Sequence, residues 1–245
     1  MGDLMHALPA ITEAKKEIPD IKFDWMVDIN FSSVPSWHPA INKVIETNHR
    51  EWKLNLFSSR SRKAIKNVIN TVNETDYDLI IDMQNNLKSA FISFLCKGSV
   101  TGMDSRSSRE YPAHLAYSKK TYIPKDMHAI DRQKMLLAFA LGYESNHSLV
   151  EYGISKQKFV KPIRDFPEQF VVCVQNASWK TKQWPIENWK DMVRELSQQG
   201  QTMLFPSGNK YELERAKEIC SVSKKAIALE VMSLNEIAFL VDNAK

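Results

Sequence analysis

The sequence predicts an α/β protein in which two doubly wound parallel-sheet domains follow one another. Two observations support this class: helical and strand periodicities alternate along the chain, and the alternation restarts after a proline-containing break. A third is the composition, since 245 residues with 43% hydrophobic and 25% charged residues, and no repeat of fixed period, are typical of a folded globular protein. This length suits one large domain or two small ones, and we prefer two.

The first half opens with a helix. Apolar residues at helical spacing follow Gly2-Asp3, which we interpret as a turn with Asp3 as the N-cap. Ile18-Pro19-Asp20 ends this helix, and residues 21–27 alternate as a strand does. The other elements predicted in this half are strands at 44–47, 79–83 and 99–103 and helices at 61–72, 87–96 and 129–141, the last ended by Gly142.

Residues 154–169 contain two prolines and little periodicity, which predicts a linker between a first domain at 1–157 and a second at 168–245. The elements predicted after it are strands at 170–174, 202–205 and 226–230 and helices at 186–198, 211–220 and 234–243. A doubly wound domain normally begins with a strand that feeds its first helix. We therefore expect the first domain to lack its first strand and the second domain to be incomplete.

Charge and cysteine content exclude several classes. The net charge of +4 is too small to indicate a nucleic-acid binder. Cys96, Cys173 and Cys220 lie far apart with no metal-ligand spacing, which is typical of reduced core thiols in a cytosolic protein. No apolar run approaches the roughly 20 residues of a membrane span, so we expect a cytoplasmic protein that is at most peripheral to a membrane.

Two places in the sequence suggest polar chemistry. Asp3 is the carboxylate that we favour, because it stands where a loop meets a helix, although an aspartate there is more often only a cap. The turn at 175–185 contains hydroxyls and two lysines between a strand and a helix, a pattern that suits a diphosphate. Composition alone equally allows a solvated loop in which Trp184 and Trp189 fix the next helix.

For each of the further candidate binding residues, a purely structural role is an alternative to ligand binding. Glu212, in the first turn of a helix, suits a ribose hydroxyl or merely the helix dipole. His38 lies in a predicted loop, where binding and turn structure are both open. One basic cluster favours an anionic ligand over a solvated helix face when taken as a group, and consists of Arg50, Lys53, Arg60, Arg62, Lys63 and Lys66. No zinc-protease, dinucleotide, P-loop or serine-hydrolase motif is present.

Five motifs together resemble the lipopolysaccharide heptosyltransferase I family. They are Met-Gly-Asp-x-x-His-x-Leu-Pro-Ala at 1–10, Pro-Ser-Trp-His at 35–38, Asp82-x-Gln84-x-x-x-Lys88-Ser89-Ala90, Gly102-Met103-Asp104 with Arg109-Glu110, and Lys182-x-Trp184-Pro185-x-Glu187-x-Trp189. The resemblance runs along the whole chain and is specific as a set. It implies a GT-B fold of two Rossmann-like domains facing across a cleft.

The resemblance also implies the activity: inverting transfer of L-glycero-D-manno-heptose from ADP-heptose to the Kdo of Kdo2-lipid A in lipopolysaccharide inner-core biosynthesis. It implies no metal and no cofactor, and a peripheral location on the cytoplasmic face of the bacterial inner membrane. Asp3 would be the general base that takes the acceptor proton, and Lys182 would neutralise the departing diphosphate. The donor would be bound by Ser178, Glu212 at the ribose and Met232 at the adenine. The acceptor's phosphates and carboxylates would be bound by Arg60, Arg62, Lys63, Lys66 and Arg109.

The family's Asp-Thr-Gly-x-x-His block, which wraps the donor phosphates and sugar, would follow Lys245, so we expect a truncated chain. Two alternatives therefore stay open. One is a non-catalytic α/β protein that binds a nucleotide or anion, and the other is an enzyme closer to heptosyltransferase II or specific for another nucleotide sugar. Turnover of ADP-sugars distinguishes the heptosyltransferase from the non-catalytic protein, a pocket that prefers UDP or CDP over ADP would indicate another donor, and the Pro-Ser-Trp-His and Met-Asp motifs favour heptosyltransferase I over II.

Overall fold

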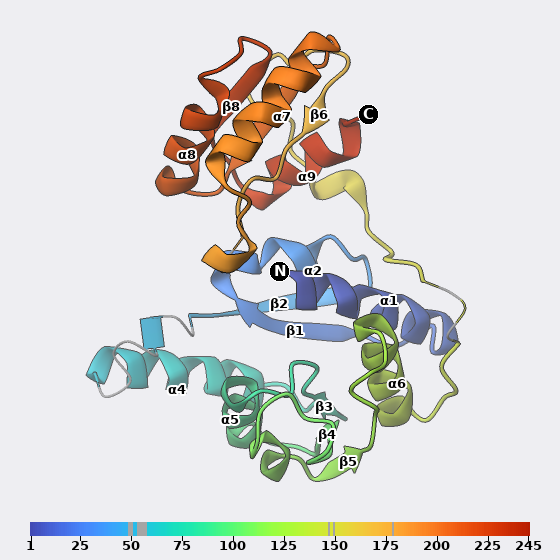
Figure 1. Ribbon diagram of the computed structural model, residues 1–245. Helices are drawn as coiled ribbons and strands as arrows, with labels where there is room; N and C mark the ends of the chain where they lie inside the picture. Colours follow the sequence, from blue (N-terminus) through green and yellow to red (C-terminus); the bar gives the residue numbers. More distant parts are fainter. Residues whose placement is uncertain (49–50, 53–57, 147, 149, 178) are drawn as a thin grey trace. The chain divides into compact units, whose positions relative to one another are not determined.

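The computed structural model describes residues 1–48, 51–52, 58–146, 148, 150–177 and 179–245 (Figure 1). These residues form two compact units, Met1–Ser155 and Lys156–Lys245. Each unit combines parallel strands with helices, which confirms the predicted α/β class.

The described part of the first unit contains two parallel sheets. β1 (Phe23–Asp28) pairs with β2 (Ile41–Thr47), while β3 (Ile80–Ile81), β4 (Val100–Met103) and β5 (Lys119–Thr121) pair in that order. The helical elements are α1 (Gly2–Glu17), η1 (Ile29–Phe31), α2 (Ser33–Ser36), α4 (Ser59–Asn73), α5 (Leu87–Leu95), η2 (Ala113–Ala116) and α6 (Ala129–Leu141). Because neighbouring strands are parallel, each connection has to cross over its sheet, and the helices provide most of these crossovers.

Helix α1 packs against α6, which crosses it near its C-terminal half (Figure 1). Ala10, Ile11 and Ala14 of α1 share a buried cluster with Leu137 of α6. Apolar side chains of β1 pack against the same cluster. The start of α1, where Asp3 lies, is therefore carried by a well-packed element.

A buried ion pair also joins α1 to α6. The Lys134 ammonium lies 2.7 Å from the Glu13 carboxylate, and the two side chains are 0% and 8% exposed. Lys134 also donates to the carbonyl of Asn146, whose backbone N–H donates to Glu13 at 3.2 Å. Losing one partner of such a buried pair generally costs about 3–5 kcal/mol, so the pair fixes the relative position of the two helices.

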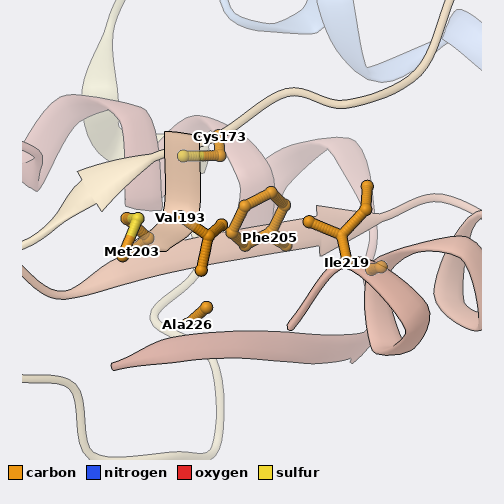
Figure 2. Close-up of a cluster of buried hydrophobic side chains, with 7 residues drawn as sticks. Cys173, Val193, Met203, Phe205, Ile219 and Ala226 are labelled. Carbon is orange, nitrogen blue, oxygen red and sulfur yellow. The ribbon is translucent and has the colours of Figure 1, made fainter. Parts of the chain in front are cut away.

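The second unit has one described sheet, in which β6 (Val171–Val172), β7 (Met203–Ser207) and β8 (Ala226–Val231) are parallel and adjacent in that order. Its helical elements are η3 (Lys156–Lys158), η4 (Lys180–Lys182), α7 (Ile186–Gln198), α8 (Lys210–Cys220) and α9 (Leu234–Asn243). Figure 2 shows its main core, where Val193 of α7 and Ile219 of α8 meet Met203 and Phe205 of β7. Cys173 completes this cluster, and burial raises the pKa of its thiol to about 11.

Helix ends follow the predicted signals except at the N-terminus. α6 ends at Gly142, which has the left-handed φ of 81° that glycine tolerates. α9 begins with a capping box between Ser233 and Glu236. The prediction that Asp3 caps α1 is wrong, because the helix already begins at Gly2 and the Asp3 carboxylate bonds to a side chain instead of to the backbone of the first turn.

Two predicted strands are shorter than expected. The 79–83 segment forms a strand only at Ile80–Ile81, and the 170–174 segment only at Val171–Val172. Ladder bonds do reach Asp82 and Cys173, whose backbone N–H groups donate to Thr101 and Leu204. Beyond those residues the chain turns away into loops, so the strands end.

The predicted linker contacts the second unit. Lys156 lies 2.6 Å from Asp242 of α9, and the Val160 N–H donates to the carbonyl of Asn235 at 3.2 Å. Phe166 stacks against Phe170 with ring centroids 6.3 Å apart. Residues just after Ser155 are thus anchored on α9.

The three cysteines are free thiols. In the described part of the chain, no helix is both long enough and apolar enough to cross a bilayer. Within the same residues, His, Cys, Asp and Glu side chains nowhere gather in threes as a metal ion would need.

Candidate functional site

The Asp3 carboxylate is held by Arg109. Arg109 Nη1 donates to Asp3 Oδ2 at 2.7 Å, and the two side chains are 62% and 56% exposed. A pair this exposed contributes only about 0–1 kcal/mol to stability. Its main effect is orientation, because the guanidinium fixes one carboxylate oxygen, and among the described residues no hydrogen-bond partner is found for the other.

The Arg109 backbone is positioned by a turn after β3 that is built on Asp82. This carboxylate is 4% exposed and accepts four hydrogen bonds, from the backbone of Gln84 and Asn85 and from the hydroxyls of Ser89 and Tyr117, at 2.7 to 3.0 Å. Burial raises the pKa of Asp82, and these hydrogen bonds oppose the shift. The four donors satisfy the carboxylate, so its burial is tolerated.

Asn85 transmits this arrangement to the rest of the site. It has a φ of 51°, a conformation that asparagine tolerates better than most residues. Its side-chain oxygen accepts from the Met103 N–H at 2.6 Å, and its carbonyl accepts from the N–H groups of Arg109 and Glu110. The Glu110 carboxylate in turn accepts from the Leu87 N–H at the start of α5. One buried turn thus fixes β4, α5 and the backbone of Arg109.

The predicted basic cluster lies mainly on α4. Arg60, Arg62, Lys63 and Lys66 are all exposed on that helix, and Ser58 caps its first turn. Arg60 lies 3.6 Å from Glu51. Arg50 and Lys53 lie outside the described residues. The four described cations therefore form an exposed basic face, as the sequence suggested.

In the second unit, unsatisfied polar atoms gather where β6 and β7 end. Within the described residues, no partner is found for Gln175 Oε1, for either side-chain atom of Asn176, or for Ser207 Oγ, and all of these atoms are buried. Buried polar atoms without partners are rare in native proteins and call for an explanation such as a bound molecule. Ligands bind at this edge of parallel sheets, which makes the strand ends a candidate ligand site.

Two of the predicted donor-binding residues border this strand edge. Glu212 accepts from the Gly208 N–H at 2.7 Å and from the Asn209 side chain at 2.8 Å, so its carboxylate organises the loop after β7. Gln175 donates to the carbonyl of Glu212. The Met232 N–H donates to the carbonyl of Ser207 at 2.8 Å. The loops after β6, β7 and β8 therefore meet at one place.

Lys182 lies on η4, an exposed turn in the loop after β6. Its backbone N–H donates to the carbonyl of Trp179, whereas the described residues include no partner for its ammonium. Ser178, the other predicted donor contact in this loop, lies outside the described residues. The Lys182 ammonium therefore has no counter-ion among the described residues. In the sequence Lys182 follows Gln175 and Asn176, whose buried polar atoms lack partners within those residues.

The aromatic pair that follows has a structural role. The Trp184 and Trp189 rings meet edge to face with centroids 5.3 Å apart, and Trp189 meets Phe205 at 5.8 Å. The Trp184 carbonyl also accepts from Arg215 of α8. The two interpretations of the 175–185 turn are a diphosphate site and a loop in which the tryptophans fix the next helix. The tryptophan contacts are present, and they do not involve the side chains of Lys180 and Lys182.

A groove of about 600 Å³ lies between α7 and α8. It is lined by Ile186, Tyr211 and four charged side chains of α8. Lys217 pairs with Glu214 on the same helix at 3.0 Å. Since the groove lies on helix surfaces and Lys217 and Glu218 already have counter-ions, we assign it no ligand.

His38 is a structural residue. Its Nδ1 accepts from the Ala40 N–H at 3.1 Å, and its Nε2 lies 2.9 Å from the Thr12 hydroxyl. The proton of the neutral ring therefore belongs on Nε2. Burial lowers the pKa of His38, and Gly153 covers the pair so closely that a Cβ there would lie 2.4 Å from Nε2.

The chain is similar to known heptosyltransferases. Residues 65–245 match the family described as Glycosyltransferase family 9 (heptosyltransferase). Lipopolysaccharide heptosyltransferase 1 of Escherichia coli strain K12 is 35% identical over 249 residues, which cover all of this chain and 77% of the relative. The Pseudomonas aeruginosa protein of the same name is 32% identical over 246 residues, covering all of this chain and 69% of the relative.

Two solved structures that match this chain are also heptosyltransferases. E. coli heptosyltransferase WaaC with ADP matches with a TM-score of 0.89 and 35% identity, covering all of this chain and 77% of that one. E. coli ADP-heptose LPS heptosyltransferase II matches with a TM-score of 0.68 at 14% identity, covering 98% of this chain and 73% of that one, which is a likeness of fold. The predicted GT-B class is thereby confirmed.

Replacing Asn85 tests the turn that carries Arg109. Asn85→Ala removes a buried acceptor and places alanine at a positive φ, so we expect a loss of about 2–4 kcal/mol in the free energy of unfolding. Hydrogen exchange should show loss of protection at the Met103 and Arg109 amides. The control Asn86→Ala removes the cap of α5 and should expose the Lys88 and Ser89 amides alone. Equal protection of Met103 in both variants would contradict this role.

His38 gives the protein a pH dependence. Because the folded-state pKa is lowered, the unfolded chain binds the proton first as the pH falls below about 6.5, and stability decreases from there down to the folded-state pKa. His38→Gln retains a donor toward Thr12 and removes the titration. Denaturant unfolding between pH 7.5 and 5.5 should show a smaller decrease in stability for this variant than for the wild type. Parallel pH profiles would rule out this origin.

Proposed function

The chain belongs to glycosyltransferase family 9, the heptosyltransferases, and on that premise we propose residue roles and an acceptor for its reaction. It is a glycosyltransferase of lipopolysaccharide inner-core biosynthesis that transfers heptose. The observation that carries this function is the 35% identity to WaaC along the entire chain, in a structure solved with ADP. A second WaaC structure, with ADP-2-deoxy-2-fluoro heptose, supports ADP-heptose as the donor.

The second unit binds the ADP part of the donor. The unsatisfied atoms of Gln175, Asn176 and Ser207 supply donors and acceptors at the strand ends. Glu212 shapes the loop that approaches the ribose, and Met232 lies beside Ser207 on the adenine side. Ser178 remains assigned to the donor by resemblance. The Lys182 ammonium neutralises the charge that develops on the diphosphate as it leaves.

The first unit supplies the base. Asp3 accepts the proton of the acceptor hydroxyl through the oxygen that Arg109 leaves unbound. Attack by this hydroxyl on the anomeric carbon, on the face opposite to the departing ADP, inverts the configuration. Arg109 has further N–H groups beyond the one on Asp3, and these suit a carboxylate of the acceptor.

The acceptor that we propose is the Kdo of Kdo2-lipid A, on the cytoplasmic face of the inner membrane. Its phosphates and carboxylates match the basic face of α4, where Arg60, Arg62, Lys63 and Lys66 are exposed without an acidic residue on the same helix. A heptosyltransferase II activity would instead require an acceptor that already carries heptose. Comparing the two acceptors separates these possibilities.

Asp3→Asn tests the base. The amide cannot take the proton, so kcat for heptose transfer should fall by about 10² to 10⁴-fold while the affinity for ADP stays the same. The control Asp20→Asn changes an exposed aspartate beyond the same helix and should retain the wild-type rate. Release of ADP measures the reaction. A kcat within a few-fold of wild type in Asp3→Asn would remove Asp3 from this role.

Lys182→Met tests the leaving-group contact. Removing one well-placed charge should lower kcat by about 10²-fold or more, because the developing negative charge loses its partner. Lys180→Met, at the other end of the same η4 turn, is the matched control and should have a much smaller effect. If both variants lose the same activity, the contribution is a general positive potential. If wild-type protein binds ADP but turns over no nucleotide sugar, the non-catalytic alternative replaces this proposal.

A further inference from the structure

Helix α5 exposes an apolar face. Leu87, Phe91, Phe94 and Leu95 are 47%, 53%, 68% and 39% exposed. At about 100° per residue these positions fall on one arc of roughly 100°. The opposite face is in the core, where Ala90 and Ile92 are 3% exposed each. α5 thus has two apolar sides, of which one is buried and the other meets solvent.

The exposed face continues beyond α5. η2 packs against α5, and two large residues, Leu115 of η2 and Tyr111 just before it, are 68% and 76% exposed. We call these six residues, the four of α5 with Tyr111 and Leu115, the α5 patch. Single exposed apolar residues are ordinary, whereas a group of this size marks a surface for a partner or a membrane.

The charge around the α5 patch indicates which partner. Lys88 lies at the edge of this arc, about 20° beyond Leu95, and Lys97 follows the end of the helix. Residues 87–97 contain no acidic side chain, and neither does α4, which packs with α5 around Ile92 and Cys96. The Glu110 carboxylate, next to Tyr111, is already bound to the Leu87 N–H at the start of α5. An apolar helix face that carries lysines and no acid of its own is the composition that binds the surface of an anionic bilayer.

The α5 patch is connected to the candidate base. The first N–H of α5, at Leu87, is bound by the Glu110 carboxylate, and the neighbouring Arg109 holds Asp3. A sugar anchored in a bilayer by its lipid would therefore present its hydroxyl close to the membrane surface that α5 meets. We propose that the α5 patch docks this protein on an anionic lipid bilayer, which brings the lipid-linked acceptor to Asp3. The identity of the acceptor in this proposal rests on the proposed function. The docking itself rests on the α5 patch alone.

Vesicle sedimentation tests the docking. Wild-type protein is mixed with vesicles of phosphatidylglycerol and phosphatidylcholine or of phosphatidylcholine alone. We expect binding to the anionic vesicles that weakens at high salt. The double variant Phe91→Ser with Phe94→Ser should bind the anionic vesicles at least about tenfold more weakly than the wild type. Phe139→Ser, an exposed phenylalanine of α6 that is 48% exposed, is the matched control and should bind like the wild type. Lys88→Gln with Lys97→Gln should reduce binding to the anionic vesicles.

A second measurement separates docking from catalysis. With a water-soluble acceptor that lacks acyl chains, the double phenylalanine variant should release ADP at the wild-type rate, and with acceptor embedded in vesicles its rate should fall in line with its binding. Absence of turnover by the wild type on both acceptors would refute the proposed function while leaving the vesicle result valid. Wild-type protein that ignores anionic vesicles, or equal binding by the double variant and Phe139→Ser, would overturn the docking. So would a dimer of the wild type that the double variant abolishes, since the α5 patch would then bind a second copy of the chain.

Discussion

The buried carboxylate of Asp82 is the interaction on which the site of the first unit depends. With one oxygen it closes the turn that contains Gln84 and Asn85, and with the other it binds Ser89 of α5 and Tyr117. Through Asn85 the same turn reaches β4 and the backbone of Arg109. The side chains for which we propose roles, Asp3 and Arg109, are exposed and weakly held, whereas the Asp82 turn that positions the Arg109 backbone is buried and hydrogen-bonded. This arrangement suits the base that we propose, because the exposed carboxylate of Asp3 can reach an acceptor while Arg109, whose backbone the turn positions, keeps the carboxylate oriented.

The second unit shows the complementary situation. Its strand ends keep buried polar atoms of Gln175, Asn176 and Ser207 without partners among the described residues, while Glu212 and Arg215 hold the surrounding loops in place. Unsatisfied atoms cost free energy in the unliganded protein, about 1–3 kcal/mol each. A nucleotide bound there, as we propose, would bond to these atoms and recover this cost.

Much of the fold was predictable from the sequence because its helices have clear signals. Gly142 predicts the end of α6, and the helices predicted at 186–198 and 234–243 have the same bounds in the structure. The β5 strand at Lys119–Thr121 was missed, since an exposed Lys-Lys-Thr edge strand has no apolar alternation. α2 was missed because Pro35 and Ser36 favour a turn. The Asp82 and Asn85 network was also missed. In the sequence, Asp82 stands out only as part of the motif that resembles a family. A carboxylate after an apolar strand does not indicate that four later residues will donate hydrogen bonds to it.

The roles of Asp3 and Arg109 came from resemblance, and their contact came from the structure, because 106 positions separate them and no local pattern couples such residues. A double-mutant cycle on kcat, at saturating acceptor, tests this contact most directly. The rates of Asp3→Asn, Arg109→Gln and the double variant are compared with that of the wild type. If Arg109 acts by orienting Asp3, the double variant has the same kcat as Asp3→Asn alone. Losses that multiply in the double variant would show that the two side chains act independently and would contradict the account.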